Sequence, residues 1–311
     1  MSNFNKRQIR TMLANSARVA KRYRSVGDIY ATNPIHGRLF FHNNIHALAM
    51  VQVVDTLAKM TGNVNKVELE VLHTAAAWHD CYHSGHPDSW RDENRKDNIQ
   101  RAIDHYGAYI QEHGLVWRTP VVRLISGTRF PYDYELPTTH GFFSEREVFL
   151  LGLLRDADAL WGMLHEYSAQ AVVGLWLERT HSGEEEKNPD PEEVVRRRMA
   201  FLKSVKPFTA AGKNFFRVFL DETLEDTERL YIEMTRQNQL AELVGDLTLD
   251  ELAQYRAGKT INQIHAARAA KAAPKQGEEL VDLVPTLDAE LPISGMPVIS
   301  ADEVLEAHGL K

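Results

Sequence analysis

Apolar residues recur along most of this chain at intervals of three and four positions, the spacing of one face of an α-helix. This pattern predicts an amphipathic helix within the first 25 residues and further helices over 43–60, 66–82, 88–113, 119–126, 144–167, 168–180, 191–205 and 216–237. No segment of the sequence alternates apolar and polar residues as a β-strand does, and no internal repeat is visible. The sequence therefore predicts an all-α fold.

The segment 144–167 is apolar on nearly all sides, which is typical of a helix at the centre of a bundle. Its start carries a capping-box pattern, with Ser144 followed three positions later by Glu147. The segment 127–141, which precedes it, contains two prolines and a pair of threonines and is predicted to be a loop.

The character of the chain changes after about Gly258, where an alanine- and lysine-rich stretch leads into an acidic segment with several prolines. We expect four parts: an N-terminal basic amphipathic helix in 1–35, a helical domain in 36–240, a short helical extension in 241–262, and a linker with a mobile acidic tail in 263–311. Such a tail is usually only solvated, and its aliphatic residues leave open that it docks on a protein partner.

The chain of 311 residues is 43% hydrophobic and 25% charged, an ordinary composition for a soluble globular protein. Its formal net charge of −7 argues against nucleic-acid binding, which usually requires an excess of Lys and Arg. A single cysteine, Cys81, excludes an internal disulfide framework and suits a reducing compartment. The longest apolar stretch, Val148–Leu154, is far shorter than the roughly 20 residues that span a bilayer. We therefore expect a cytoplasmic protein without membrane association.

The first 25 residues carry seven Lys and Arg residues and no acidic residue. They lack the central apolar block of a secretory signal, so we do not expect one. The basic face of this helix could lie against an acidic surface or against a phosphate, and we expect the acidic surface.

Fourteen histidines are unusual for this length, and nine of them fall within the first 113 residues. Three fragments, at 41–47, 77–83 and 155–160, place His or Asp side chains inside apolar helical segments. Burying such groups is costly unless they are paired or bind a cation. Two other histidines have plainer interpretations: His73 is expected to be a satisfied core residue, and His105 lies on a polar helix and suits a surface role.

Helical spacing turns His46 and Asp158 toward the protein interior. His79 and Asp80 are neighbours and project about 100° apart on a helix, but a long imidazole and a short carboxylate can still converge on one ion. Asp156 also faces inward, so periodicity does not choose between Asp156 and Asp158. A site with nitrogen and oxygen donors suits Mn, Fe, Zn, Co or Mg rather than a cysteine-type structural zinc.

The order of these residues resembles the HD-domain superfamily of metal-dependent phosphohydrolases. Residues 42–47 read His-Asn-Asn-Ile-His-Ala, similar to the His-Asn-x-x-His-Ala motif of its cyclic-nucleotide phosphodiesterase-like branch. Residues 79–83 read His-Asp-Cys-Tyr-His, similar to the His-Asp-x-x-His motif of that branch. Residues 157–160 read Ala-Asp-Ala-Leu, similar to the Ala-Asp-x-Leu ending of many smaller HD hydrolases. The resemblance covers about residues 38–160 and implies an HD-domain-like helical bundle.

The resemblance implies a metal site for one or two divalent ions, whose ligands would be His46, His79, Asp80 and Asp158. It further implies that Asp80 can bridge a second ion, that His42 donates a proton to the leaving oxygen, and that His83 orients water or supports the site. The motif match favours Asp158 over Asp156. Arg38 is a candidate contact for a further phosphate oxygen.

The function expected from these residues and from the resemblance is a metal-dependent phosphohydrolase, of phosphodiesterase or nucleotidase type. It would use metal-activated water to cleave a phosphoester of a nucleotide or nucleotide-like substrate. The expected partner is therefore a small phosphorylated molecule, and the chain is a candidate homo-oligomer. Two alternatives stay open: an HD-type di-iron oxygenase, which needs two further histidine ligands, and a catalytically idle HD scaffold that binds partners.

Overall fold

A computed structural model describes residues 3–86, 97–115, 119–129, 144–182 and 190–245, together with single residues between 251 and 268. Within these ranges the chain is helical and contains no β-strand, which confirms the predicted all-α class. The chain divides into two compact units whose boundary lies inside one long helix, between Thr227 and Glu228. The residues considered below belong to the first unit.

The described ranges contain a series of helices. They are α1 (Lys6–Ala20), α2 (Arg24–Ala31), α3 (Asn44–Thr61), α4 (Lys66–Trp78), α5 (Asn98–Glu112), α6 (Thr119–Ser126), α7 (Glu145–Leu160), α8 (His165–Ala169), α9 (Leu175–Ser182), α10 (Pro191–Ser204) and α11 (Ala210–Gly245). Between them lie short 3₁₀ turns, η1 (Lys21–Tyr23), η2 (His36–Arg38) and η4 (Trp161–Met163), and one π-helical turn, η5 (Gln170–Gly174). Among the described helices, none is long and apolar enough to cross a lipid bilayer.

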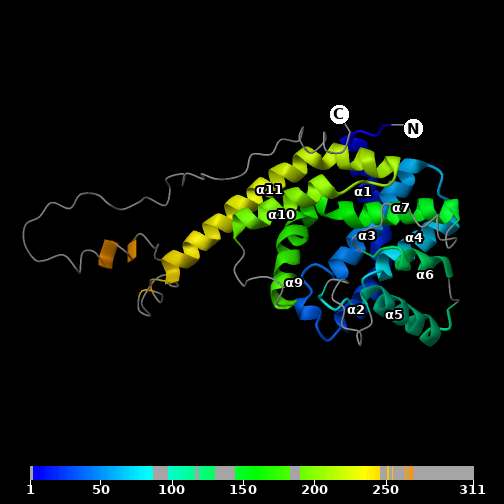
Figure 1. Cartoon of the computed structure of the whole chain (residues 1–311), viewed down its shortest axis with the longest axis horizontal. Helices are drawn as coiled ribbons and strands as arrows, with labels where there is room; N and C mark the ends of the chain where they lie inside the picture. The colour runs from blue at the N-terminus through cyan, green and yellow to red at the C-terminus, as the bar shows by residue number, and fades with distance from the viewer. Residues whose placement is uncertain are drawn as a thin grey trace, which may run out of the picture. The chain divides into compact units, whose positions relative to one another are not determined.

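Helix α3 forms the centre of the first unit (Figure 1) and contacts α1, α2, α4 and α7. Its apolar side chains are buried on several sides, because the consecutive residues Ala49, Met50 and Val51, which project about 100° apart, have no exposed surface. Helix α4 in turn contacts α6 and α7. Because α3 is packed on several sides, its first turn has a fixed position, and His46 lies in that turn.

The predicted capping box at the start of α7 is confirmed. The Ser144 side chain accepts a hydrogen bond from the backbone of Glu147, and the Glu147 carboxylate accepts one from the backbone of Ser144. The acidic support expected for the basic N-terminal helix is also present, because Lys6 and Arg10 of α1 both pair with Glu222 of α11.

Two predicted helices end earlier than their apolar patterns suggest. Helix α4 ends at Trp78 instead of Tyr82, and α7 ends at Leu160 instead of Tyr167. At the first break Tyr82 takes a left-handed backbone conformation, with a φ of 64°. Tertiary contacts hold it there, because its ring stacks on His105 at 3.5 Å and its hydroxyl lies 2.7 Å from that of Thr32. Local periodicity carries no information about such contacts.

Other expectations fall partly or wholly outside the described residues. Helix α5 begins at Asn98, and residues 88–96 of the predicted helix lie outside the description. Most of the predicted loop 127–141 and the tail beyond residue 268 also lie outside the described residues. Helix α11 begins at Ala210, six residues before the predicted start.

A buried ion cluster joins α3 to α4. Asp55 is fully buried, and its carboxylate lies 2.9 Å from Nε2 of His73 and 2.5 Å from Nζ of Lys59. This confirms His73 as a satisfied core residue. Burial by itself raises the pKa of the Asp55 carboxyl, but hydrogen bonds from His73, Lys59 and Ser16 outweigh it and lower the pKa from 3.8 to about 2.

We expect Asp55→Asn to lower the free energy of unfolding at pH 7 by roughly 2–3 kcal/mol, the equivalent of a shift of about two pKa units. A carboxyl whose pKa falls on folding stabilises the folded state above the pKa of the unfolded chain. The difference between the wild-type chain and Asp55→Asn should therefore shrink as the pH falls from about 4 toward 2. Denaturant unfolding over this pH range measures it.

The matched control is Asp28→Asn, which changes an exposed carboxylate on α2. It should alter stability by no more than about 0.5 kcal/mol. If the two variants unfold alike at pH 7, the Asp55 cluster contributes no net stability.

Candidate metal centre

The first motif is positioned by the N-cap of α3. The Asn43 side chain accepts hydrogen bonds from the backbone N–H of Ile45 at 2.9 Å and of His46 at 3.3 Å. His46 therefore lies in the first helical turn and is completely buried. Its ring is held between the rings of Phe41 and Trp161, at centroid distances of 5.2 and 4.7 Å.

The second motif follows the end of α4. His79 is the C-cap residue, and its Nδ1 lies 2.9 Å from the backbone carbonyl of Ala76. A carbonyl oxygen only accepts hydrogen bonds, so Nδ1 carries a proton, and Nε2 is the nitrogen that can bind a cation once its own proton is displaced. Asp80 belongs to the turn that follows the helix. The chain leaves the helical path at this point, and the side chains of two neighbouring residues can therefore face the same space.

Four side chains from three segments converge at this place. The Nε2 atoms of His46 and His79 lie 3.1 Å apart, and each is 3.0 Å from Oδ2 of Asp80. Oδ1 of Asp158, on α7, lies 3.4 Å and 3.6 Å from the same two nitrogens. Ligand atoms about 2.1 Å from a common ion are separated from one another by roughly 3.0–3.4 Å. The spacing of these donors therefore suits a single divalent cation.

The carboxylates and imidazoles perturb one another strongly. Burial raises the pKa of Asp80 and Asp158, but the neighbouring histidines and their hydrogen bonds lower both values well below the ordinary range. For His79, burial lowers the pKa and the two carboxylates raise it well above its ordinary value. Both acids are therefore carboxylates at neutral pH, the form that binds a cation.

The structure separates the two inward-facing acids of α7. Both oxygens of Asp156 are taken by the start of α11, through the backbone N–H of Phe208 at 2.7 Å, the backbone N–H of Thr209 at 2.9 Å and the Thr209 hydroxyl at 2.6 Å. Asp158 lies two positions further, about 200° around the helix, and faces the two histidines. Asp156 is a structural acceptor, and Asp158 belongs to the cluster.

A buried glutamate on α9 orients His42. Oε1 of Glu178 lies 2.5 Å from Nδ1 of His42, and Oε2 accepts hydrogen bonds from the backbone N–H of Phe41 and of His42 at 3.0 and 3.1 Å. Burial lowers the pKa of His42, but the charges of Glu178 and Asp80 raise it to about 9. The imidazole is therefore held protonated, with Nε2 as the nitrogen that Glu178 does not occupy.

His83 lies against His42 with the rings stacked at 3.6 Å. Its Nε2 lies 2.8 Å from the side-chain amide of Asn98, and burial together with the charge of His42 lowers its pKa to about 3. His42, Asp80 and His83 form a second group whose donor atoms all lie within 4.8 Å of one another. Asp80 is thus close to both groups, an arrangement with room for one ion or two.

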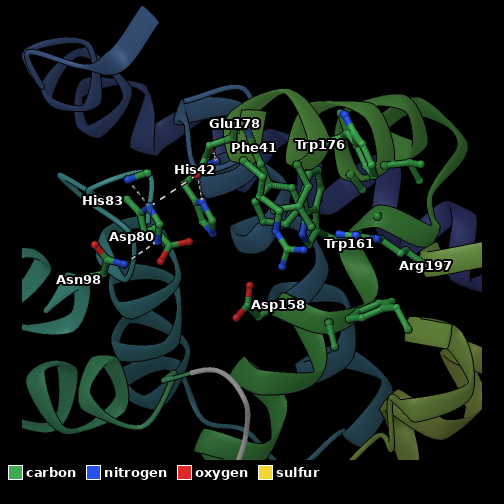
Figure 2. A pocket seen from close by; sticks show the side chains of 18 of the residues that line it. Phe41, His42, Asp80, His83, Asn98, Asp158, Trp161, Trp176, Glu178 and Arg197 are labelled. Carbon is green, nitrogen blue, oxygen red and sulfur yellow. Dashed lines mark hydrogen bonds and ion pairs between the residues drawn. The ribbon is translucent and has the colours of Figure 1, made fainter. Parts of the chain in front are cut away.

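These side chains line one part of a cavity of about 320 Å³ (Figure 2). Asp80, Asp158 and His42 face the same open space, and the aromatic walls come from Phe41, Trp161 and Trp176. Arg38, the predicted phosphate contact, is exposed in η2 and is not among the residues that line this cavity.

Sequence reasoning missed Glu178 altogether. It lies more than 130 residues from His42 and belongs to no motif. The only signal was an acidic residue beside Leu175, Trp176 and Leu177 in a segment predicted to be helical. Comparison of the chain with protein-family models, with curated proteins and with solved structures finds no match. The case for function therefore depends on the geometry of this site.

We expect the full-length protein to bind one equivalent of Mn²⁺ or more, and His46→Ala and Asp158→Asn to weaken that binding by at least about 100-fold. The reason is that each substitution removes one donor from the converging set. Isothermal titration with Mn²⁺ measures the affinity.

Asp156→Asn is the matched control, since it removes a carboxylate from the same helix two positions away. It should change the affinity by no more than about threefold, whatever it does to stability. Wild-type Mn²⁺ affinity in Asp158→Asn would exclude this cluster as the metal site.

Proposed function

We propose that this protein is a metal-dependent phosphohydrolase that cleaves a phosphoester of a nucleotide or nucleotide-like substrate. The observation that carries the proposal is the convergence of His46, His79, Asp80 and Asp158 within 3.0–3.6 Å contacts at one end of a cavity. Nitrogen and oxygen donors in this combination suit Mn, Fe, Zn, Co or Mg. When bound, such an ion polarises a phosphoryl oxygen and lowers the pKa of water.

The orientation of His42 supports hydrolysis over passive metal storage. Glu178 holds the imidazole at Nδ1, so its free edge is turned to the cavity that Asp80 and Asp158 also line. A proton donor beside the scissile phosphate assists departure of the leaving oxygen, an effect worth roughly 10²–10⁴-fold. Glu178 acts through His42 and is a positioning residue.

The aromatic residues that line the cavity favour a substrate with an aromatic ring. Trp161 and Trp176 line it together with Phe41, and Val172 and Leu175 add aliphatic surface. Flat apolar walls of this kind accommodate a nucleobase by stacking. A cavity of about 320 Å³ is at the lower end of the range for small-molecule sites, which favours a substrate of about nucleotide size over a polymer.

The second donor group, His42, Asp80 and His83, would provide donors for a second ion. An HD-type di-iron oxygenase is the alternative that such a site would serve. Iron bound at two equivalents, with oxygen consumed during turnover, would favour that alternative. Phosphate release in the absence of oxygen favours the hydrolase.

Purified protein supplied with Mn²⁺, Mg²⁺ or Co²⁺ should release phosphate or cleave a phosphodiester in a screen of mono-, tri- and cyclic nucleotides. His79→Ala and Asp80→Ala should abolish turnover and metal content while leaving the helical circular dichroism intact. His73→Gln removes another buried imidazole from α4 and should keep its activity. Activity retained in metal-free His79→Ala, or no activity in the loaded wild type against any substrate, would refute the proposal.

The role of His42 depends on the leaving group. His42→Asn should retain Mn²⁺ and lose about 10²–10⁴-fold in kcat on an alkyl phosphoester, whose leaving oxygen needs a proton. On a p-nitrophenyl phosphoester the loss in kcat should be much smaller, because nitrophenolate is a stable anion and leaves without being protonated. Steady-state kinetics on both substrates measures this difference.

Glu178→Gln should show the same dependence on leaving group with a smaller loss, and KM should change less than kcat. Equal losses on both substrates for His42→Asn would assign that residue to structure or binding and not to proton donation.

A further inference from the structure

The far end of the cavity carries positive charge that the metal centre does not use. Arg179, Arg197 and Arg198 line the same cavity as Asp80, Asp158 and Glu178. The arginines come from α9 and α10, elements that follow the three motifs in the chain. None of these arginines is needed to hold the four donors together.

Arg198 is the most deeply placed of these cations, since only 8% of its surface is exposed. Its Nη2 donates a hydrogen bond to the backbone carbonyl of Gly162 at 2.8 Å, and its Nε has no hydrogen-bond partner among the described residues. Burial lowers the pKa of the guanidinium to about 10, partly offset by the charge of Asp226, so it remains a cation at neutral pH. A buried cation with an unused donor is costly unless an anion approaches it.

The contact with Gly162 places this guanidinium near the metal centre. Gly162 follows Asp158 by four positions, and the chain between them is helical, first in α7 and then in η4. Four residues of α-helix or 3₁₀-helix rise by roughly 6–8 Å. The backbone carbonyl that Arg198 contacts thus lies about one helical turn along the chain from Asp158.

The charges along the cavity wall favour an anion at this place. Asp80 and Asp158 offset a divalent ion, and Glu178 offsets the protonated His42. The arginines add positive charge to the cavity wall, offset in part by Glu193 beside Arg197 and by Asp226 near Arg198. Arg197 also pairs with Glu193, and its guanidinium lies 5.2 Å above the ring of Trp176 (Figure 2).

We propose that Arg198, assisted by Arg197, forms an anion-binding subsite that receives a second negatively charged group of the substrate. The substrate class is then a phosphoester whose organic part carries a further phosphate or carboxylate. A planar guanidinium binds either group through paired hydrogen bonds. The assignment to a substrate rests on the proposed function, whereas anion binding at Arg198 does not.

The test is a titration of the full-length protein with inorganic phosphate in EDTA and 150 mM NaCl, followed by ³¹P NMR or calorimetry. Without metal, phosphate should bind saturably to wild type and to Asp158→Asn, and Arg198→Met should weaken this binding at least tenfold. Arg196→Met is the matched control: it removes the same charge from the neighbouring position of α10, which does not line the cavity, and should bind phosphate as wild type does.

Folding of each variant is checked by its thermal unfolding. If Arg198→Met does not fold, Arg197→Met, an exposed position, should still weaken phosphate binding threefold or more. Metal-free phosphate binding that is absent from folded wild type, or unchanged in folded Arg198→Met, overturns the subsite. If phosphate binds as predicted but the protein hydrolyses no phosphoester, the anion-binding subsite is supported and only the proposed hydrolase function is refuted.

In the metal-loaded protein, adenosine 3′,5′-bisphosphate should be cleaved with at least tenfold higher kcat/KM than adenosine 5′-monophosphate, and Arg198→Met should remove this preference. A carboxylate in place of the second phosphate is tested by inhibition of turnover with N-phosphonoacetyl-aspartate. No preference between the two nucleotides in wild type would overturn the assignment of the subsite to substrate.

Discussion

Two carboxylates and two imidazoles held within hydrogen-bonding distance of one another, and largely removed from water, impose the main constraint on this fold. Asp80 and Asp158 both approach the same pair of histidine nitrogens. The two carboxylates repel each other in a poorly solvated site, and the neighbouring imidazoles, or a cation bound between the four side chains, offset that repulsion. The surrounding helices hold the three segments in the positions that this arrangement requires.

The scaffold achieves this by fixing the segment before α3. Asn43 caps the helix, and its Oδ1 also accepts a hydrogen bond from the Gln170 side chain at 2.9 Å. Gln170 belongs to η5 and Glu178 to α9, so the later part of the chain contacts the first motif through the side chains of two polar residues. The π-helical turn of η5 falls at this contact, as such turns often do at functional sites.

The cavity is therefore built from two sets of elements with different tasks. The ends of α3, α4 and α7 provide the donors for a cation, whereas α9 and α10 provide Glu178, which orients His42, together with Trp176 and the arginines. A bound cation at one place and arginines at another would hold the two negative groups of a substrate at fixed positions in the cavity. Specificity would then depend on α9 and α10, which could change without disturbing the metal centre.

The sequence alone determined the helical class, the bounds of α3 within one residue, the capping box of α7 and the burial of His46. These features follow from local periodicity and cap chemistry, which neighbouring residues encode. Only the tertiary structure distinguished Asp158 as a candidate metal ligand from Asp156. Both side chains face inward, but the backbone at the start of α11 forms hydrogen bonds with Asp156. The tertiary structure likewise supplied Glu178, since a contact over more than 130 residues leaves no periodic trace in the chain.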